Sequence, residues 1–171
     1  MTRRILKYGD PILETRCDPV AEFDTAELNQ LVADMFETMY ANKGVGLAAP
    51  QVGVQKRLTV IDCSAGQDDT QKLVLINPEI LKLDGSQVGE EGCLSIPGFR
   101  EDVKRAMHAT VRAQNPKGEF FEITGQELLA RAMQHEIDHL NGVLFLSHLS
   151  ILKRDLIRRK IRKLVKAGEW N

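Results

Sequence analysis

The sequence predicts an α+β fold in a single domain, 1–171. Three observations predict it: the 171 residues contain no repeat or linker, short apolar segments alternate as in strands, and three longer segments have apolar residues at helical spacing. The second of these helices, at about 124–142, has little purely polar surface and is therefore expected at the centre of the domain.

The first half of the chain is expected to contain one helix and three short strands. Asp24 and Glu27 have the spacing of an N-cap and its reciprocal partner, and the apolar stripe that follows predicts a helix from about 25 to 41. Three glycines and a proline between Gly44 and Gly53 predict an irregular connection. The strands are expected at 58–62, at 73–76 and near 80–83.

The second half is expected to alternate between strands and helices. A half-buried strand over 103–113 is followed by a turn at Asn115–Gly118 and a returning strand at 119–123. Thr124 and Glu127 have the spacing of a second capping box, and Gly142 is expected to end the helix that they begin. A short strand at 143–146 and a last helix at about 150–166 follow. The packed face of this last helix is expected to contain Leu152, Leu156, Ile161 and Leu164.

The composition is that of a soluble globular protein. Hydrophobic residues are 43% and charged residues 27%, and neither a membrane-length apolar run nor a secretory leader is present. The three cysteines, Cys17, Cys63 and Cys93, are too few for a disulfide framework and fit a reducing compartment. We therefore expect a cytoplasmic protein without membrane contact, in which Cys17 and Cys63 are small buried hydrophobes.

Positive charge is concentrated near the end of the chain. Residues 150–171 contain eight Lys/Arg and two acidic residues, whereas the whole chain has a net charge of −1. Such a segment is typical either of a solvated helix face or of a surface that binds a polyanion. Its basic residues are Lys153, Arg154, Arg158, Arg159, Lys160, Arg162, Lys163 and Lys166.

The segment 134–139 contains the pattern H-E-x-x-H. On a helix, His135 and His139 share one face and can bind one metal ion, and Glu136 beside them can reach a water on that metal. This is the arrangement of a metal-activated hydrolase, although a chance match in a charged helix gives the same letters. A catalytic site of this kind needs a third protein ligand.

Cys93 is the candidate for the third ligand. It follows a glycine in the segment Glu90–Gly98, which is expected to be neither helix nor regular strand. A lone cysteine is most often a small hydrophobe, but one thiolate and two imidazoles complete a three-ligand catalytic site. His108 is expected at the surface, and His148 is expected to cap or solvate the start of the last helix.

Three motifs, in this order along the chain, resemble those of the peptide deformylases: Gly-Val-Gly-Leu-Ala-Ala-Pro-Gln from Gly44, Glu-Gly-Cys-Leu-Ser from Glu91, and Gln-His-Glu-Ile-Asp-His from Gln134. The resemblance extends over essentially the whole chain. It implies the peptide deformylase fold, with antiparallel sheets around a central helix carrying the metal motif and a C-terminal helix. It also implies hydrolysis of the formyl group from the N-terminal formyl-methionine of newly made proteins, which releases formate.

The resemblance implies roles for individual residues. Cys93, His135 and His139 would bind the metal, and Glu136 would be the general acid and base. The side-chain amide of Gln51 and the backbone N–H of Leu94 would face the developing oxyanion. The residues implied near the substrate are Gly44, Val45, Gly46, Glu91, Arg100, Leu128 and Ala132. Arg131 lies beside them, where a more apolar residue is expected.

The resemblance also implies the cofactor and the partners. One divalent metal ion is expected, with Fe²⁺ as the physiological ion and Zn²⁺, Ni²⁺ or Co²⁺ able to occupy the site. The substrates are N-formyl-methionyl nascent peptides, and the protein is expected to be a monomer. Because the substrate emerges from the ribosome, the basic helix at 150–166 is a candidate ribosome-binding element.

Two other readings of the metal motif remain open. An H-E-x-x-H zinc endopeptidase normally takes its third ligand from downstream of the helix, where His148 is the available histidine. A structural metal protein or a nucleic-acid-binding module using the basic tail belongs to a different class. Structural sites usually have four protein ligands, and neither of these proteins would need Glu136 beside the metal.

Overall fold

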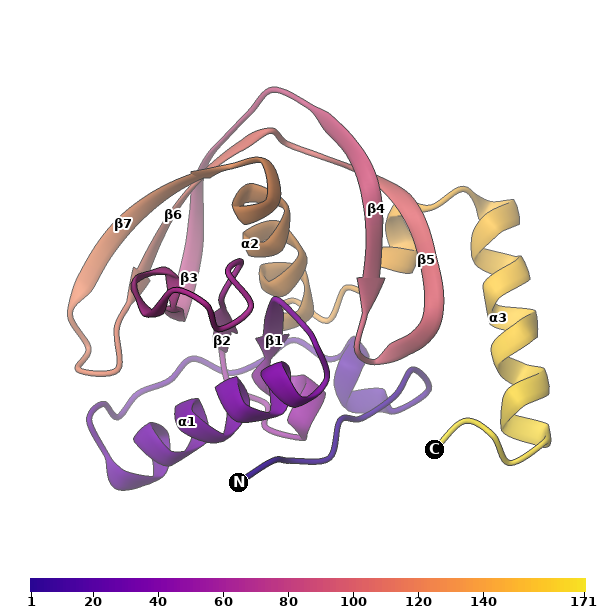
Figure 1. Cartoon of the computed structure of the whole chain (residues 1–171), viewed down its shortest axis with the longest axis horizontal. Coiled ribbons are helices and arrows are strands. Elements are labelled where there is room, and N and C mark those ends of the chain that lie inside the picture. Colours follow the sequence, from indigo (N-terminus) through magenta and orange to yellow (C-terminus); the bar gives the residue numbers. More distant parts are fainter.

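The computed structural model describes residues 1–171 and has the predicted α+β architecture. Helix α2 (Glu127–Leu140) lies at the centre, between a five-stranded sheet and a two-stranded sheet (Figure 1). Helix α1 (Ala26–Ala41) packs below the larger sheet, and helix α3 (Ile151–Lys166) lies outside the smaller one. None of these helices is both long enough and apolar enough to cross a membrane.

Both sheets are antiparallel. The larger has the strand order β1-β2-β3-β6-β7, and the smaller pairs β4 with β5. The strands are β1 Gly46–Ala48, β2 Leu58–Ile61, β3 Leu73–Asp84, β4 Gln87–Cys93, β5 Ile96–Arg105, β6 His108–Gln114 and β7 Phe120–Gln126. Short 3-10 helices are η1 Pro11–Glu14, η2 Ala49–Val52, η3 Asp69–Gln71 and η4 Phe145–His148.

The two strands predicted at 73–76 and near 80–83 form the single strand β3. A β-bulge between Ile76 and Glu79 accommodates the interruption that separated them in the sequence. Asn77 has a φ of 50°, and its side chain bonds to the backbone N–H and carbonyl of Val20. Pro78 has no N–H to donate to the neighbouring strand, and at a bulge no such hydrogen bond is required.

The prediction of a single strand over 103–113 is wrong, because this segment contains the end of one strand and the whole of the next up to residue 113. β5 ends at Arg105 and β6 begins at His108, since the chain passes from the small sheet to the large one between them. The expectation of irregular structure for Glu90–Gly98 is also wrong: this segment contains the end of β4 and the start of β5. The predicted turn at Asn115–Gly118 is confirmed by the Gly118 N–H, which donates to the Asn115 carbonyl at 2.8 Å.

Two further segments differ from prediction. The strand expected at 143–146 is absent, and η4 begins there instead. The connection Gly44–Gly53, expected to be irregular, contains β1 and η2. β1 pairs only with β2, so its other edge is open.

The N-cap of α1 is Thr25 and not Asp24. The Thr25 hydroxyl accepts from the N–H of Leu28 at 3.1 Å, whereas Asp24 has a left-handed φ of 54° and accepts from the side chain of Asn29. Thr25 has the extended backbone that an N-cap requires.

The capping box predicted for α2 is also wrong. Thr124 belongs to β7, where its hydroxyl bonds to that of Thr110 across the sheet. β7 leads directly into α2, and the Glu127 N–H donates to the Met107 carbonyl at 3.0 Å. The connection between β5 and β6 therefore provides the acceptor for a helix N-terminal N–H that a side-chain cap would otherwise bind. The predicted helix end is close to the observed one, with Gly142 in a left-handed conformation two residues after Leu140.

α2 is held in the centre by burial of one apolar face. Ala130, Met133 and Ile137 pack against buried residues of β2, β3 and β6 in one cluster. Burying one large apolar side chain stabilises the fold by about 1.5–3 kcal/mol relative to leaving it exposed. Any rotation of α2 about its axis would expose these side chains, so their burial fixes which face of the helix points to the large sheet. The opposite face, with Arg131 and His135, is turned toward β4 and β5.

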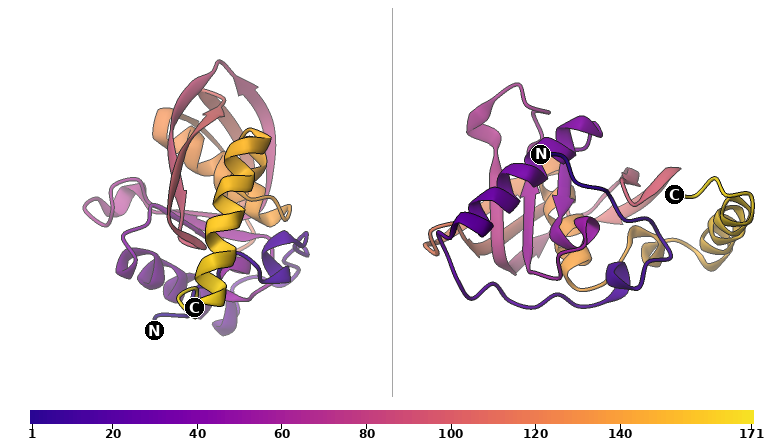
Figure 2. Two further views of the ribbon diagram at one scale, coloured as in Figure 1. Left: turned by 90° about the vertical axis from the view of Figure 1, so that its right-hand side faces the viewer. Right: turned by 90° about the horizontal axis from the view of Figure 1, so that it is seen from below.

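The packed face of α3 is rotated from the prediction. Ile157 and Ile161 are buried, whereas Leu152 is 70% and Leu156 is 44% exposed. Arg158, expected on the free basic face, is half-buried and donates to the Tyr8 hydroxyl. Figure 2 shows α3 at one end of the molecule. Ile157 and Ile161 share one apolar cluster there with buried residues of η1, β5 and η4.

Candidate metal centre

The three predicted metal ligands converge at the inner face of α2. The Cys93 Sγ lies 3.4 Å from the His139 Nε2, which lies 3.2 Å from the His135 Nε2. All three ligand atoms lie within 4.8 Å of one another. Bonds of about 2.0–2.1 Å to nitrogen and 2.3 Å to sulfur place tetrahedral ligand atoms roughly 3.3–3.6 Å apart. The cluster therefore has the size that one divalent ion requires.

Two elements position these ligands. The histidines are four residues apart on α2, so their rings project from the same face, and both are buried. Cys93 is the last residue of β4, where a register irregularity after Gly92 turns the strand toward the helix. The helical part of this geometry is local, whereas the position of Cys93 depends on how the small sheet docks.

Glu91 orients the His135 ring by binding its Nδ1, the ring nitrogen that faces away from the ligand cluster. Its carboxylate accepts from the His135 Nδ1 at 2.8 Å, from the Nε and Nη2 of Arg105 at 2.9 Å each, and from Arg131. Burial raises the pKa of Glu91, but hydrogen bonds from Arg105 and His135 outweigh it and hold the pKa well below its usual range. With its Nδ1 donating to an ionised carboxylate, His135 presents the Nε2 lone pair to the cluster.

The cluster itself favours a bound positive charge. Burial lowers the pKa of His135, but hydrogen bonds with Cys93 and Glu91 raise it to about 10. Burial and the neighbouring His135 lower the pKa of His139 well below its ordinary value. One cation, a proton or a metal ion, is therefore stabilised among these three side chains, which agrees with the donor set of a transition-metal site.

Glu136 lies beside the cluster and is not one of its ligands. It is 5% exposed, and its Oε2 has no hydrogen-bond partner in the protein. A Cβ built on Gly46 would lie 2.5 Å from the Glu136 Oε1, so only glycine leaves room for this carboxylate. Burial raises the pKa of Glu136 to about 7. A carboxyl group with this pKa can both accept and donate a proton near neutral pH.

Gln51 and Leu94 lie on the other side of Cys93. The Gln51 Oε1 accepts from the Ala48 N–H at 2.9 Å, and its Nε2 donates to the Ser95 Oγ at 3.1 Å and to the Cys93 Sγ at 3.5 Å. The Leu94 N–H makes no hydrogen bond within the chain. The Gln51 amide is thus fixed in orientation with one N–H toward the cluster, and Leu94 offers a second donor.

A cleft of about 1000 Å³ opens from the cluster to the surface. Its lining includes every residue that the sequence placed near the substrate: Gly44, Val45, Gly46, Glu91, Arg100, Leu128 and Ala132. Glu91 differs from the others, since it is buried beneath the floor and contacts His135. Arg100 lies at the mouth and pairs with Glu90.

The other candidate residues lie away from the cluster. His148 bonds to Asp138 at 2.8 Å, and His108 is exposed as predicted. Cys17 is buried and Cys63 half-buried, and neither belongs to the ligand group.

Sequence reasoning missed Arg105 and left Arg131 without a role. Both guanidinium groups are buried against Glu91, and Arg131 also donates to the Val103 carbonyl at 2.9 Å. Charged residues are common in both β5 and α2, so the presence of these arginines was not itself a signal. Their common partner lies 14 residues from Arg105 and 40 from Arg131, so no local pattern connects them.

Comparison with known proteins gives a consistent result. Residues 2–155 match the family model described as polypeptide deformylase. The peptide deformylase of Acidobacterium capsulatum is 60% identical over 170 residues, 99% of each chain. A crystal structure of a peptide deformylase from Legionella pneumophila is similar with a TM-score of 0.91 and 47% identity, covering 100% of this chain and 99% of that one. The structure from Thermotoga maritima has a TM-score of 0.82 and 44% identity, covering 88% and 99%.

Proposed function

The chain belongs to the polypeptide deformylase family, whose members remove the formyl group from the amino terminus of nascent polypeptides, and from that premise we propose which residues perform the reaction. Cys93, His135 and His139 hold one divalent metal ion, and Glu136 transfers protons beside it. The observation that carries the proposal is the convergence of the three ligand atoms next to a buried carboxylate without a hydrogen-bond partner on Oε2.

Different groups of the protein then have different roles in the reaction. A bound divalent ion would supply Lewis acidity and lower the pKa of a water to about 7. Glu136 takes the proton that this water loses and later delivers it to the leaving amine. The Gln51 amide and the Leu94 N–H stabilise the negative charge that develops on the formyl oxygen, because both donors are fixed before the reaction begins.

The cleft determines which substrate reaches this centre. The segment Gly44–Gly46 leads into the open edge of β1, and its backbone can pair with the peptide as an added strand. Leu128 and Ala132 form walls of a pocket for the methionine side chain, and Arg100 supports the mouth. A formyl carbon carries only hydrogen, so the narrow space beside Gly46 and Glu136 can exclude larger acyl groups.

We also propose the domain organisation, the oligomeric state, the cellular location and the identity of the metal. The whole chain forms one catalytic domain that acts as a cytoplasmic monomer. Fe²⁺ is the physiological ion, and Zn²⁺, Ni²⁺ or Co²⁺ can replace it, because a thiolate and two imidazoles accept each of these ions. The zinc endopeptidase alternative has no support, since its downstream candidate His148 is engaged with Asp138.

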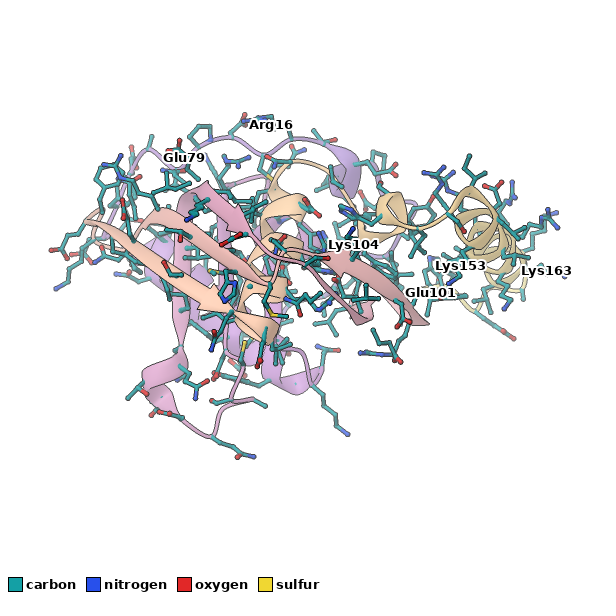
Figure 3. All side chains as sticks on the ribbon, turned by 90° about the horizontal axis from the view of Figure 1, so that it is seen from above. Arg16, Glu79, Glu101, Lys104, Lys153 and Lys163 are labelled. Atoms are coloured by element: carbon teal, nitrogen blue, oxygen red, sulfur yellow. The ribbon has the colours of Figure 1, made fainter.

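We also propose that α3 binds the ribosome. Lys153 contacts Glu101 of β5, whereas Lys163 points away from the body of the protein (Figure 3). Ile157 and Ile161 hold the helix in place, and its outer surface presents exposed cations together with Leu152 and Leu156. Ribosomal RNA is a polyanion, so this surface suits it, and docking would bring the cleft near the emerging substrate.

The deciding experiment is replacement of Glu136 by Gln. Glu136→Gln should bind metal normally, because Glu136 is not a ligand, yet lose about 10²–10⁴-fold in kcat for formate release from a formyl-methionyl peptide. Metal content and formate release are measured on the same preparation, with Glu22→Gln, an exposed site, as the matched control. Formate release near the wild-type rate by Glu136→Gln would remove this residue from the mechanism.

A further inference from the structure

The cleft extends well beyond the space that formyl-methionine needs. Its volume of about 1000 Å³ is at the upper end of the range for sites that bind drug-sized molecules. The N-terminal segment of the chain forms part of its wall, because the Leu6 N–H donates to the Gln51 carbonyl and the Tyr8 N–H to the Ser95 carbonyl, both at 2.8 Å. In Figure 1 this segment runs below β1 toward the tip of the β4–β5 hairpin. The outer cleft can therefore contact residues that follow the methionine.

This outer part of the cleft carries unpaired positive charge. Arg4 and Lys7 of the N-terminal segment line it, and Lys43 lines it from the loop that leads to Gly44. None of these three cations forms an ion pair in the protein, unlike Arg3 and Arg100, which are paired with Asp34 and Glu90.

None of the acidic side chains that line the cleft forms an ion pair with these cations. Glu91 and Glu136 are buried at its inner end, and Glu90 is already paired with Arg100. The chain as a whole has a net charge of −1, so the positive charge at the cleft mouth does not follow from an overall excess of basic residues. A cleft of one sign with low-dielectric walls concentrates field lines and attracts ligands of opposite charge.

We propose that Arg4, Lys7 and Lys43 make this enzyme selective for formyl-methionyl chains with acidic residues directly after the methionine. The inference rests on the proposed function, since it places the formyl group at the Cys93–His135–His139 cluster and directs the peptide outward. Carboxylates on the following residues then lie among three cations without counter-ions. Lysine or arginine at the same positions meets like charge, which weakens binding.

The test compares three formylated peptides that differ only in charge: formyl-Met-Glu-Glu-amide, formyl-Met-Ala-Ala-amide and formyl-Met-Lys-Lys-amide. The terminal amide removes the carboxylate that a short peptide would otherwise add. With metal-loaded enzyme at low ionic strength, kcat/KM should be about tenfold higher for the acidic peptide than for the basic one, mainly through KM. The ratio should fall toward one at high salt, where exposed charges are screened.

Two triple variants attribute the ratio to the cleft. Replacing Arg4, Lys7 and Lys43 by Gln should bring the acidic-to-basic ratio close to one, and replacing them by Glu should invert it. A matched control replaces three exposed lysines that lie outside the cleft and form no ion pairs by Glu, so it changes net charge equally and should keep the wild-type ratio. These control lysines are Lys56, Lys82 and Lys117.

The outcomes separate this inference from the proposed function. If the neutral peptide releases no formate, the proposed function fails. If the neutral peptide is cleaved but the acidic and basic peptides react equally, only the charge selectivity fails. If the control variant inverts the ratio as the Arg4/Lys7/Lys43 variant does, the effect comes from net charge and the assignment to the cleft is overturned.

Discussion

At the scale of single residues, the metal centre depends on Cys93 more than on any other cysteine. Cys93→Ala removes one of three ligands and should abolish stable metal binding, because two imidazoles alone hold a divalent ion weakly. Cys63→Ala is the matched control, since that thiol lies outside the ligand group and its loss should affect stability only. Metal per chain after desalting is the measurement. Retention of metal by Cys93→Ala together with loss by Cys63→Ala would show that the third ligand is misassigned.

Arg131 is the other residue whose role the structure defines. It joins Arg105 in holding Glu91, and Glu91 in turn holds the His135 ring. Arg131→Leu should weaken metal affinity by about 10–100-fold, the usual effect of losing an outer-shell partner. Arg131→Lys keeps a cation beside Glu91 and should recover most of this affinity.

Two measurements test Arg131: the metal dissociation constant and the visible absorption spectrum of the cobalt-loaded protein, which reports ligand geometry. The leucine variant should shift the spectrum, and the lysine variant should restore it. Equal affinities and spectra for wild type and Arg131→Leu would leave Arg105 as the sole support of Glu91.

At the scale of elements, α3 yields a prediction about ribosome binding. Replacing Arg159, Arg162 and Lys163 by Glu should weaken ribosome binding steeply, because these exposed cations have no ion-pair partner in the protein and would contact phosphates. Hydrolysis of a short formyl-peptide should be unchanged, since α3 does not line the cleft.

Co-sedimentation with ribosomes across a salt series measures the effect. The Glu variant of Lys56, Lys82 and Lys117 again serves as the control of equal charge. Identical binding by the two variants, or no binding by wild type at low salt, would reduce α3 to a solvated helix.

Local sequence patterns predicted the helices and the histidine pair, and long-range contacts explain the errors. The positions of His135 and His139 follow from helical spacing alone, so the structure places them as expected. The cap of α2 was wrong because a carbonyl of Met107, twenty residues earlier in sequence, satisfies the Glu127 N–H. Likewise, the arginines around Glu91 come together only when β4, β5 and α2 dock, and no periodicity reports that event.

At the scale of the whole molecule, the bound ion should contribute to stability as well as to catalysis. The ligand set is complete only in the folded state, so metal that binds the native protein shifts the folding equilibrium by mass action. Metal at about 1,000 times its Kd stabilises the folded state by about 4 kcal/mol. Removing it by chelation should therefore lower Tm by roughly 10 °C, since 1 kcal/mol corresponds to about 2–4 °C for a chain of this size.

Calorimetry before and after chelation, and again after re-addition of metal, measures this shift. Glu136→Gln should show the same decrease, because it keeps all three ligands. An unchanged Tm would mean that the folded protein binds the metal no more tightly than the unfolded chain does.

The separation of the ligands along the chain makes the ion a cross-link between segments. Cys93 ends the small sheet, while His139 lies 46 residues later on the central helix. Closing a loop of that length by a covalent bridge would stabilise a folded chain by about 4 kcal/mol through lost unfolded-state entropy, an upper bound for a reversible metal bond. Oxidation of the Cys93 thiolate would therefore open this loop and loosen the β4–β5 hairpin from α2. An oxidised molecule would then be more susceptible to proteolysis at the hairpin than one inactivated by Glu136→Gln.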